Sequence, residues 1–347
     1  MRAFNYDFLE ELSYPMETLR LISRINEYKG KQDLYIRQAP ELLNTLRSVA
    51  VIQSTKASNA IEGIIVTDKR LKSIMDKSTE PMDRSEGEIA GYRDVLDLIH
   101  SSHEAITIEP NVLLQLHRMI YKYLSFEGGS WKNSDNVITE TLPTREKRIR
   151  FQPTSAFETP KAMEELCFEF KLNRGKDHVE PLILIAVFVL DFLCIHPFND
   201  GNVRMARLLT LLLLYHFGYE VGRYISLEKI IEDTKEGYYE SLRISSMDWH
   251  ENKNNIFPWI HYLLGTIIAA YKQLEDRVGL VESKKGGKSE RVERFIENKI
   301  GFFTKEDIKN ACPDVSESTI TRVLQQLKSN NRIEISEHGR NAKWRKT

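Results

Sequence analysis

Apolar residues recur every three or four positions along most of the chain, and strand-like alternation of apolar and polar residues is rare. This spacing gives a helix one apolar face. It predicts helices over residues 43–63, 84–101, 111–124, 160–173 and 256–274. A polar stretch that contains Pro81 separates the first two. We therefore expect a mainly α protein whose N-terminal region is all helical.

Two strongly apolar segments lie in the middle of the chain. Residues 182–195 form a run that is too long and too continuous for an ordinary strand, so they predict a buried helix. Pro197 cannot continue that helix, which places His196 at its end. Helical spacing resumes over residues 203–215, so a short polar loop connects two core helices.

The connecting loop ends with Asp200, Gly201 and Asn202, just before the first turn of the second helix. Backbone N–H groups in a first helical turn have no intrahelical partner, and such a turn attracts anions. Arg204 and Arg207 are three residues apart on that helix. Both planar guanidinium groups can therefore reach one phosphate chain.

Each of these features has an ordinary explanation when it occurs alone. A single histidine at a helix end is usually a cap, Asp-Gly-Asn is a turn, and two arginines on one helix face are solvated. Here all of them lie within twelve residues, between two core helices. Their coincidence favours a phosphate site, in which a neutral imidazole with an ordinary pKa of ~6.5 takes the proton of an attacking hydroxyl.

Residues 196–207, HPFNDGNVRMAR, resemble the signature of the Fic family, His-Pro-Phe-x-Asp/Glu-Gly-Asn-Gly-Arg-x-x-Arg. The resemblance implies a Fic-type helical core that transfers AMP from ATP to a hydroxyl of a target protein, with Mg2+ as the metal ion. It also implies roles for the matching residues: His196 as general base, Phe198 as loop anchor, Asp200 as Mg2+ ligand, and Gly201, Asn202, Arg204 and Arg207 as nucleotide-binding residues.

Val203 is the one departure from this signature, because the family usually has a second glycine at this nucleotide-binding position. A β-branched residue disfavours positive φ and adds bulk beside the phosphates. Family members without this glycine include relatives that transfer phosphate rather than a nucleotide. The sequence leaves three outcomes open: AMP transfer, phosphate transfer, or nucleotide binding without turnover.

A second pattern lies far upstream, where Ser58 and Glu62 are four residues apart and Gly63 follows. The spacing places both side chains on one face of a helix that the glycine ends. Taken alone, the pattern is also typical of a surface helix. It resembles the inhibitory motif of Fic proteins, Ser/Thr-x-x-x-Glu-Gly/Asn. The resemblance implies that Glu62 pairs with Arg207 and occupies the guanidinium that the γ-phosphate of ATP needs.

Two further segments resemble parts of the same site. Residues 129–138, followed after a charged turn by 148–151, predict a short β-hairpin among the helices. An ordinary surface hairpin fits nearly as well as the family's flap, which pairs with an extended target segment by strand addition. Segment 237–242, GYYESL, resembles the family segment whose tyrosine lines the adenine pocket, which implies that role for Tyr239.

Composition bounds the class of protein. With 347 residues, 41% of them apolar, the chain can build two or three domains. Its net charge of −1 gives no overall attraction to nucleic acid or anionic membranes. Three widely spaced cysteines argue against a disulfide framework or a zinc site. The N-terminus lacks the order of a signal peptide and the apolar helices are short or interrupted, so we expect a cytoplasmic protein without membrane contact.

The chain is basic from residue 283 onward, with 15 lysines and arginines against 9 acidic residues. Residues 283–288 predict a linker. Helices follow over 290–299, 304–311 and 316–329, and strands over 332–336 and 342–345. This order resembles a winged helix, a module that binds DNA, binds proteins or forms dimers. The resemblance makes six residues candidates for DNA contact: Ser318, Thr319, Thr321, Arg322, Arg340 and Lys343.

These patterns predict three regions: a helical region with the inhibitory motif over 1–105, a catalytic core with a hairpin flap over 106–280, and a winged-helix (α+β) domain over 288–347. Two functions fit. One is a protein adenylyltransferase, autoinhibited by Glu62, for which self-modification within a homodimer is an expectation. The other is a DNA-binding regulator whose Fic-like core senses a nucleotide or transfers phosphate. The complete set of base, metal ligand and arginines favours the enzyme.

Overall fold

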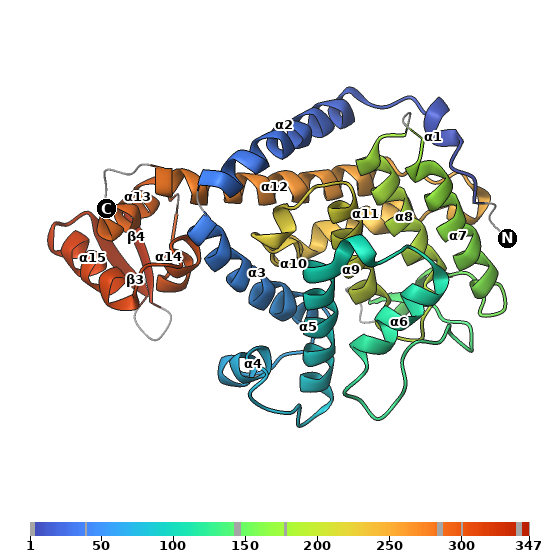
Figure 1. Cartoon of the computed structure of the whole chain (residues 1–347), viewed down its shortest axis with the longest axis horizontal. Helices are drawn as coiled ribbons and strands as arrows, with labels where there is room; N and C mark the ends of the chain where they lie inside the picture. The colour runs from blue at the N-terminus through green and yellow to red at the C-terminus, as the bar shows by residue number, and fades with distance from the viewer. Residues whose placement is uncertain are drawn as a thin grey trace.

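The computed structural model describes residues 4–38, 40–141, 147–176, 179–282, 287–299, 301–337 and 342–346. Helices dominate, as the sequence predicts, and the strands within these ranges form two short antiparallel hairpins. The long helix α12 (Phe257–Glu282) runs through the main body and leads to the C-terminal helices (Figure 1).

The N-terminal region is helical throughout its regular elements, as predicted. They are α1 (Phe8–Glu11), α2 (Met16–Gln38), α3 (Pro40–Ile61), α4 (Asp68–Met75), α5 (Arg84–Ser102) and the short 3-10 helix η1 (His103–Ala105). Helix α2 lies along α12 (Figure 1), where the rings of Tyr28 and Tyr271 stack with their centroids 5.5 Å apart. Helix α3 is held against the central helices by Ser54, which donates to Glu228 at 2.6 Å.

The central region contains the predicted core helices. They are α6 (Pro110–Ile120), α7 (Thr159–Arg174), α8 (Pro181–Ile195), α9 (Asn202–His216), η2 (Val221–Arg223), α10 (Leu227–Asp233), α11 (Lys235–Ser245), η3 (Trp249–Glu251) and α12. Two predicted ends are wrong. Helix α6 ends four residues before the predicted 124, and α12 runs eight residues beyond the predicted 274.

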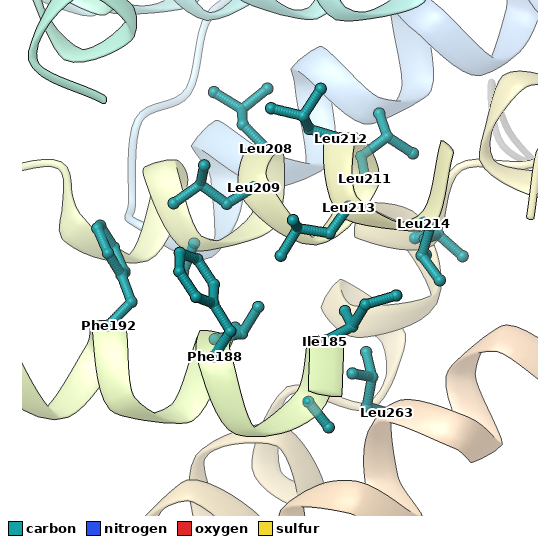
Figure 2. Close-up of a cluster of buried hydrophobic side chains, with 14 of the residues drawn as sticks. Ile185, Phe188, Phe192, Leu208, Leu209, Leu211, Leu212, Leu213, Leu214 and Leu263 are labelled. Carbon is teal, nitrogen blue, oxygen red and sulfur yellow. The ribbon is translucent and has the colours of Figure 1, made fainter. Parts of the chain in front are cut away.

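Helices α8 and α9 pack against each other at the centre of the largest hydrophobic core. Figure 2 shows Phe188 and Phe192 of α8 pointing toward α9, while Leu208 and Leu212 point away from α8 to the other side of α9. All but the first residue of α8 are buried, which explains why residues 182–195 are apolar at every position except Asp191. This packing fixes the loop between the two helices.

The first hairpin pairs β1 (Ile138–Thr141) with β2 (Lys147–Phe151). The second strand lies where the sequence predicts it, whereas Ile138 is the one residue of the predicted segment 129–138 that belongs to a strand. The C-terminal segment forms α13 (Lys288–Asn298), α14 (Lys305–Ala311), α15 (Glu317–Ser329), β3 (Ile333–Glu337) and β4 (Lys343–Lys346), with a hydrophobic core of its own. Ser316 caps α15 by accepting the Thr319 N–H. Lys288, placed in the linker by the sequence, begins α13 instead.

Candidate active site

His196 lies at the C-terminal end of α8, where its backbone is left-handed with φ of 52°. Its N–H donates to the Phe192 carbonyl at 3.0 Å and closes the last helical turn. Ring atom Nδ1 lies 3.3 Å from the Leu193 carbonyl oxygen, and since a carbonyl only accepts, this contact leaves Nε2 free to take a proton. Burial lowers the pKa of His196 to about 4, so the imidazole is neutral near neutral pH.

The side chain of Asn202 closes the loop that follows His196. Its Oδ1 accepts the Phe198 N–H and its Nδ2 donates to the Phe198 carbonyl, both at 2.8 Å. The Phe198 ring is fully buried and lies parallel to the His117 ring, with the centroids 3.7 Å apart. Phe198 thus anchors the loop in the core. Asn202 uses its amide within the loop and brings only its backbone N–H to the first turn of α9.

The turn before α9 requires a glycine. Gly201 has φ of 79°, and a Cβ there would lie 2.7 Å from the Tyr121 hydroxyl. Its N–H donates to Asp200 Oδ1 at 2.6 Å. His117 Nδ1 accepts the Gly129 N–H at 2.9 Å, so the ring proton is on Nε2. His117 Nε2 therefore donates to the Asp200 carbonyl oxygen at 3.0 Å. Helix α6 therefore holds the turn in place through a neutral imidazole.

Arg204 is buried between α5 and α6. Its Nη1 donates to Glu88 Oε2, and its Nη2 donates to the Tyr121 hydroxyl at 2.8 Å. The other oxygen of Glu88 accepts from Arg84 Nε at 2.6 Å. Arg84 Nη2 in turn donates to Asp200 Oδ2 at 2.9 Å. Four charged side chains thus form one chain of contacts across the start of α9.

Arg207, one turn further along α9, is buried and contacts α3 instead. Its Nε donates to Ser58 Oγ at 2.9 Å and its Nη2 to the Ser58 carbonyl at 2.8 Å. Both Nη atoms also donate to Glu62 Oε1 at 3.1 Å. Glu62 follows the last residue of α3, and its side chain is 28% exposed. The sequence pair Ser58 and Glu62 therefore meets Arg207, the partner that the resemblance implied.

A cavity of about 140 Å³ opens beside His196. Its lining includes Ile138 of the first hairpin, Val203 of α9 and Tyr239 of α11, together with His196 itself. Burial raises the pKa of Tyr239 to about 12, so its hydroxyl stays protonated. Tyr239 and His196 thus share one cavity, with Val203 on its wall.

The expected backbone strain at Val203 is absent. Helix α9 begins at Asn202, and Val203 is not among the described residues with positive φ. The argument from positive φ was therefore wrong, because the left-handed turn falls at Gly201, two residues earlier. Only the bulk of Val203 bears on the site, where its partly buried side chain lines the cavity without filling it.

The segment before the first hairpin is bonded to the signature loop. Lys132 donates from its backbone N–H to the Pro197 carbonyl at 2.8 Å and from Nζ to the Ile195 carbonyl at 3.0 Å. Burial lowers the pKa of Lys132 to about 8. Asn136 Nδ2 donates to the Phe198 carbonyl at 3.3 Å and Asn136 Oδ1 accepts from Lys132. The segment that leads into the hairpin is thus bonded directly to the His196 loop.

Several residues of the site were not identified from the sequence: Arg84, Glu88, His117, Tyr121 and Lys132. Arg84 and Glu88 are four apart on a helix, a spacing that is usual for a surface ion pair. Nothing local indicates that Glu88 is buried or that it meets α9. The one usable signal was His117, an isolated histidine on an otherwise apolar helix face.

The C-terminal candidates are spread over the module. Ser318, Arg322 and Lys343 are exposed. Thr321 accepts from Lys305 Nζ at 3.1 Å, and Arg322 donates to Ser289 at 3.0 Å. Thr319 is partly buried beside the α15 cap. Arg340 lies outside the described residues.

Other basic residues of the C-terminal segment are paired with acidic residues, so part of its positive charge is neutralised internally. These pairs are Arg291 with Asp314, Arg332 with Glu297 and Arg345 with Glu334.

No group of three or more His, Cys, Asp or Glu side chains within the described ranges is arranged to hold a metal ion by itself. A divalent cation at Asp200 would therefore need ligands from a bound substrate. Among the helices in the described part of the chain, none has the length and hydropathy needed to cross a bilayer.

Comparison with known sequences gives a consistent match over this site. Residues 107–214 match the model of the Fic/DOC family. A protein adenylyltransferase Fic of Nematostella vectensis is 25% identical over 224 residues, covering 62% of this chain and 46% of the relative. A protein adenylyltransferase Fic of Drosophila erecta is 23% identical over 250 residues, covering 69% of this chain and 45% of the relative. The chain spans less than half of the length of these two curated relatives.

Two solved structures share the fold. A Fic family protein from Desulfovibrio desulfuricans is 20% identical with a TM-score of 0.61, and the match covers 97% of both chains. A Fic domain containing signaling protein from Bacteroides thetaiotaomicron is 21% identical with a TM-score of 0.62, covering 74% of this chain and 97% of the other.

Proposed function

Because this chain is a Fic family protein, we propose that it is a protein adenylyltransferase, which transfers AMP from ATP to a hydroxyl side chain of a target protein and is restrained by Glu62. One observation carries the proposal: a neutral His196 with a free Nε2 borders a cavity next to the first turn of α9. The same proposal includes self-modification, in which the target is another copy of this chain and which a homodimer would suit.

In the proposed reaction, His196 Nε2 takes the proton of the target hydroxyl. The hydroxyl oxygen then forms a bond to the α-phosphorus of ATP, and the bond from that phosphorus to pyrophosphate breaks. Backbone N–H groups at Asn202 and Val203 would bind phosphate oxygens, since the first turn of a helix offers unpaired donors. The Gly201 N–H would join them only after leaving Asp200 Oδ1. Tyr239, which lines the same cavity, would contact the adenosine part.

The residues around Asp200 fit Mg2+. This ion commonly binds one or two carboxylates together with substrate phosphates, and Asp200 offers a half-exposed carboxylate at the anion-attracting end of α9. When bound, the ion would neutralise charge on the polyphosphate. Arg204 would add a fixed positive charge, since Glu88 and Tyr121 already orient its guanidinium.

Autoinhibition by Glu62 is supported by the contacts of Arg207. Four of its five N–H groups donate to Ser58 or Glu62, so a phosphate that binds the guanidinium through two N–H groups must displace one of these partners. Ser58 is fixed within α3, whereas Glu62 lies past the helix end and is partly exposed. Glu62 is therefore the group that a nucleotide would replace.

The test uses the full chain with Glu62→Gly, incubated with ATP labelled on either its α- or its γ-phosphate. We expect label on protein from α-labelled ATP only, at least about tenfold above the unsubstituted chain, which corresponds to about 1.4 kcal/mol of lost competition. If protein is labelled from γ-labelled ATP alone, the reaction is phosphate transfer rather than AMP transfer. This is the outcome that the sequence associated with Val203. His196→Ala in the same background should remove the label, and no label with either ATP would leave the regulator as the better function.

For the C-terminal segment we propose a winged helix, supported by the order of α13, α14, α15 and the β3–β4 hairpin. The alternative function, a DNA-binding regulator, requires that this segment contact DNA. The candidate residues for that contact are Ser318, Thr319, Thr321, Arg322, Arg340 and Lys343. The test is a gel shift of the full chain with random duplex DNA at low salt, where the absence of any shift would remove this alternative.

A further inference from the structure

Arg84 is the one charged side chain outside the signature that contacts the proposed metal ligand within the described residues. It begins α5, and its side chain is 65% exposed. Its Nη2 donates to Asp200 Oδ2, while Asp200 Oδ1 accepts the Gly201 N–H. Both oxygens of Asp200 are therefore engaged, and the guanidinium lies on the oxygen that the loop leaves available.

Glu88 keeps Arg84 close to this position. The Glu88 carboxylate is 3% exposed and accepts from Arg204 through one oxygen and from Arg84 Nε through the other. Arg84 therefore uses different nitrogens for its two partners. The planar guanidinium would turn as one unit to release Asp200, and Arg204 would keep its own oxygen of Glu88 when it does.

A divalent cation and a guanidinium are alternative partners for one carboxylate oxygen, because each satisfies its negative charge. The Arg84 contact with Asp200 is exposed on both sides, with 65% and 50% of the side chains accessible. Exposed ion pairs are weak, so a more highly charged ion can replace this one. The buried Arg204 contact with Glu88 is not exchangeable in this way, because neither group can reach water.

We propose that Arg84 is a built-in counterion of Asp200, which the divalent cation must displace when the metal–nucleotide complex binds. This inference rests on the proposed role of Asp200 as metal ligand. Arg84 then sets how much the metal adds to nucleotide affinity. In the metal-free chain it holds the Asp200 side chain in the orientation that the cation needs and prevents an unpaired carboxylate from repelling the phosphates.

The experiment measures the affinity of the full chain for a non-hydrolysable ATP analogue, once with Mn2+ and once with a chelator. The dissociation constant with the chelator, divided by the dissociation constant with Mn2+, gives the coupling between metal and nucleotide without any catalysis. Glu62→Gly is present throughout so that the nucleotide can bind. Arg84→Gln should raise the ratio about two- to fivefold, the range that an exposed ion pair corresponds to. Arg84→Lys, which keeps the charge, should give a smaller rise.

Two controls separate this inference from the proposed function. Arg345→Gln removes the same charge from an exposed ion pair in the C-terminal segment and should leave the ratio unchanged. Asp200→Ala should reduce the ratio to near one, and if it does not, the assignment of the metal to Asp200 fails and this inference fails with it. If Asp200→Ala reduces the ratio to near one but Arg84→Gln leaves it unchanged or lowers it, the counterion role of Arg84 is wrong. The metal site at Asp200 would then still stand.

Discussion

Arg204 and Arg207 lie one turn apart on the same helix, but the two sides of α9 hold them differently. On the α5 side, Glu88 is as buried as the arginine it pairs with, and Tyr121 adds a hydrogen bond. On the α3 side, Arg207 is equally buried, but its carboxylate partner Glu62 lies at a helix end with 28% of its side chain exposed. The sequence spacing of the two arginines does not indicate this difference.

The difference in burial separates a permanent contact from a replaceable one. Removing a charge from a fully buried pair leaves the other charge without water or partner, which is costly. Removing Glu62 admits water to Arg207, and the two Ser58 contacts remain. We therefore expect the α5 side to contribute mainly to stability and orientation, and the α3 side to control access.

Glu88→Ala should cause the largest loss of stability. It leaves Arg204 buried without its ion-pair partner, which we expect to lower the free energy of unfolding by about 3–5 kcal/mol. Urea unfolding followed by circular dichroism measures this. The matched control is Glu240→Ala, which breaks an exposed pair with Arg243 and should change the same quantity by less than about 0.5 kcal/mol. Similar losses in both variants would contradict the permanent role of Glu88.

Acid should weaken the turn before α9, which His117 of α6 holds through the Asp200 carbonyl. Burial lowers the pKa of His117 to about 4 from its ordinary 6.5, so the unfolded chain takes up this proton first as the pH falls. The resulting stability is complete above pH 6.5 and is lost as the pH falls toward 4. In this window we expect a loss on the order of 3 kcal/mol. Protonation would also turn Nδ1 into a donor facing the Gly129 N–H.

The measurement is urea unfolding across this pH window for the unsubstituted chain and for His117→Gln. The substitution removes the titrating group, so the pH dependence of the free energy of unfolding should become shallower by the His117 contribution. His196, whose pKa is lowered in the same direction, remains in both proteins and cancels in the difference. Parallel pH profiles for the two proteins would show that His117 is not the group responsible.

The sequence predicted the local features of this site better than its long-range contacts. The two apolar runs predicted α8 and α9, and the break between them placed His196 at a helix end, because periodicity and proline act within a few residues. The contacts of Glu88 and Arg84 join residues 116 apart in the chain. No local pattern encodes such a pairing, since it depends on how α5 packs beside α9.

Glu62→Ala should change stability little while changing access to Arg207. Because the carboxylate is partly exposed, we expect the free energy of unfolding to fall by about 1 kcal/mol or less. Binding of the ATP analogue, measured by calorimetry, should strengthen by about tenfold, since the nucleotide no longer competes with the carboxylate. A loss of stability as large as that of Glu88→Ala, with unchanged nucleotide affinity, would make the two sides of α9 equivalent.

Ser58→Ala should have the smallest effect and shows which part of the α3 side restrains the nucleotide. The substitution removes the hydroxyl that accepts from Arg207 Nε but keeps the backbone carbonyl that accepts from Nη2. One lost hydrogen bond corresponds to about 1 kcal/mol, so nucleotide affinity should rise by no more than about fivefold and remain below that of Glu62→Ala. Calorimetry on both variants gives the order. An effect of Ser58→Ala that equals or exceeds that of Glu62→Ala would mean that the fixed serine, rather than the exposed carboxylate, keeps Arg207 from the phosphate.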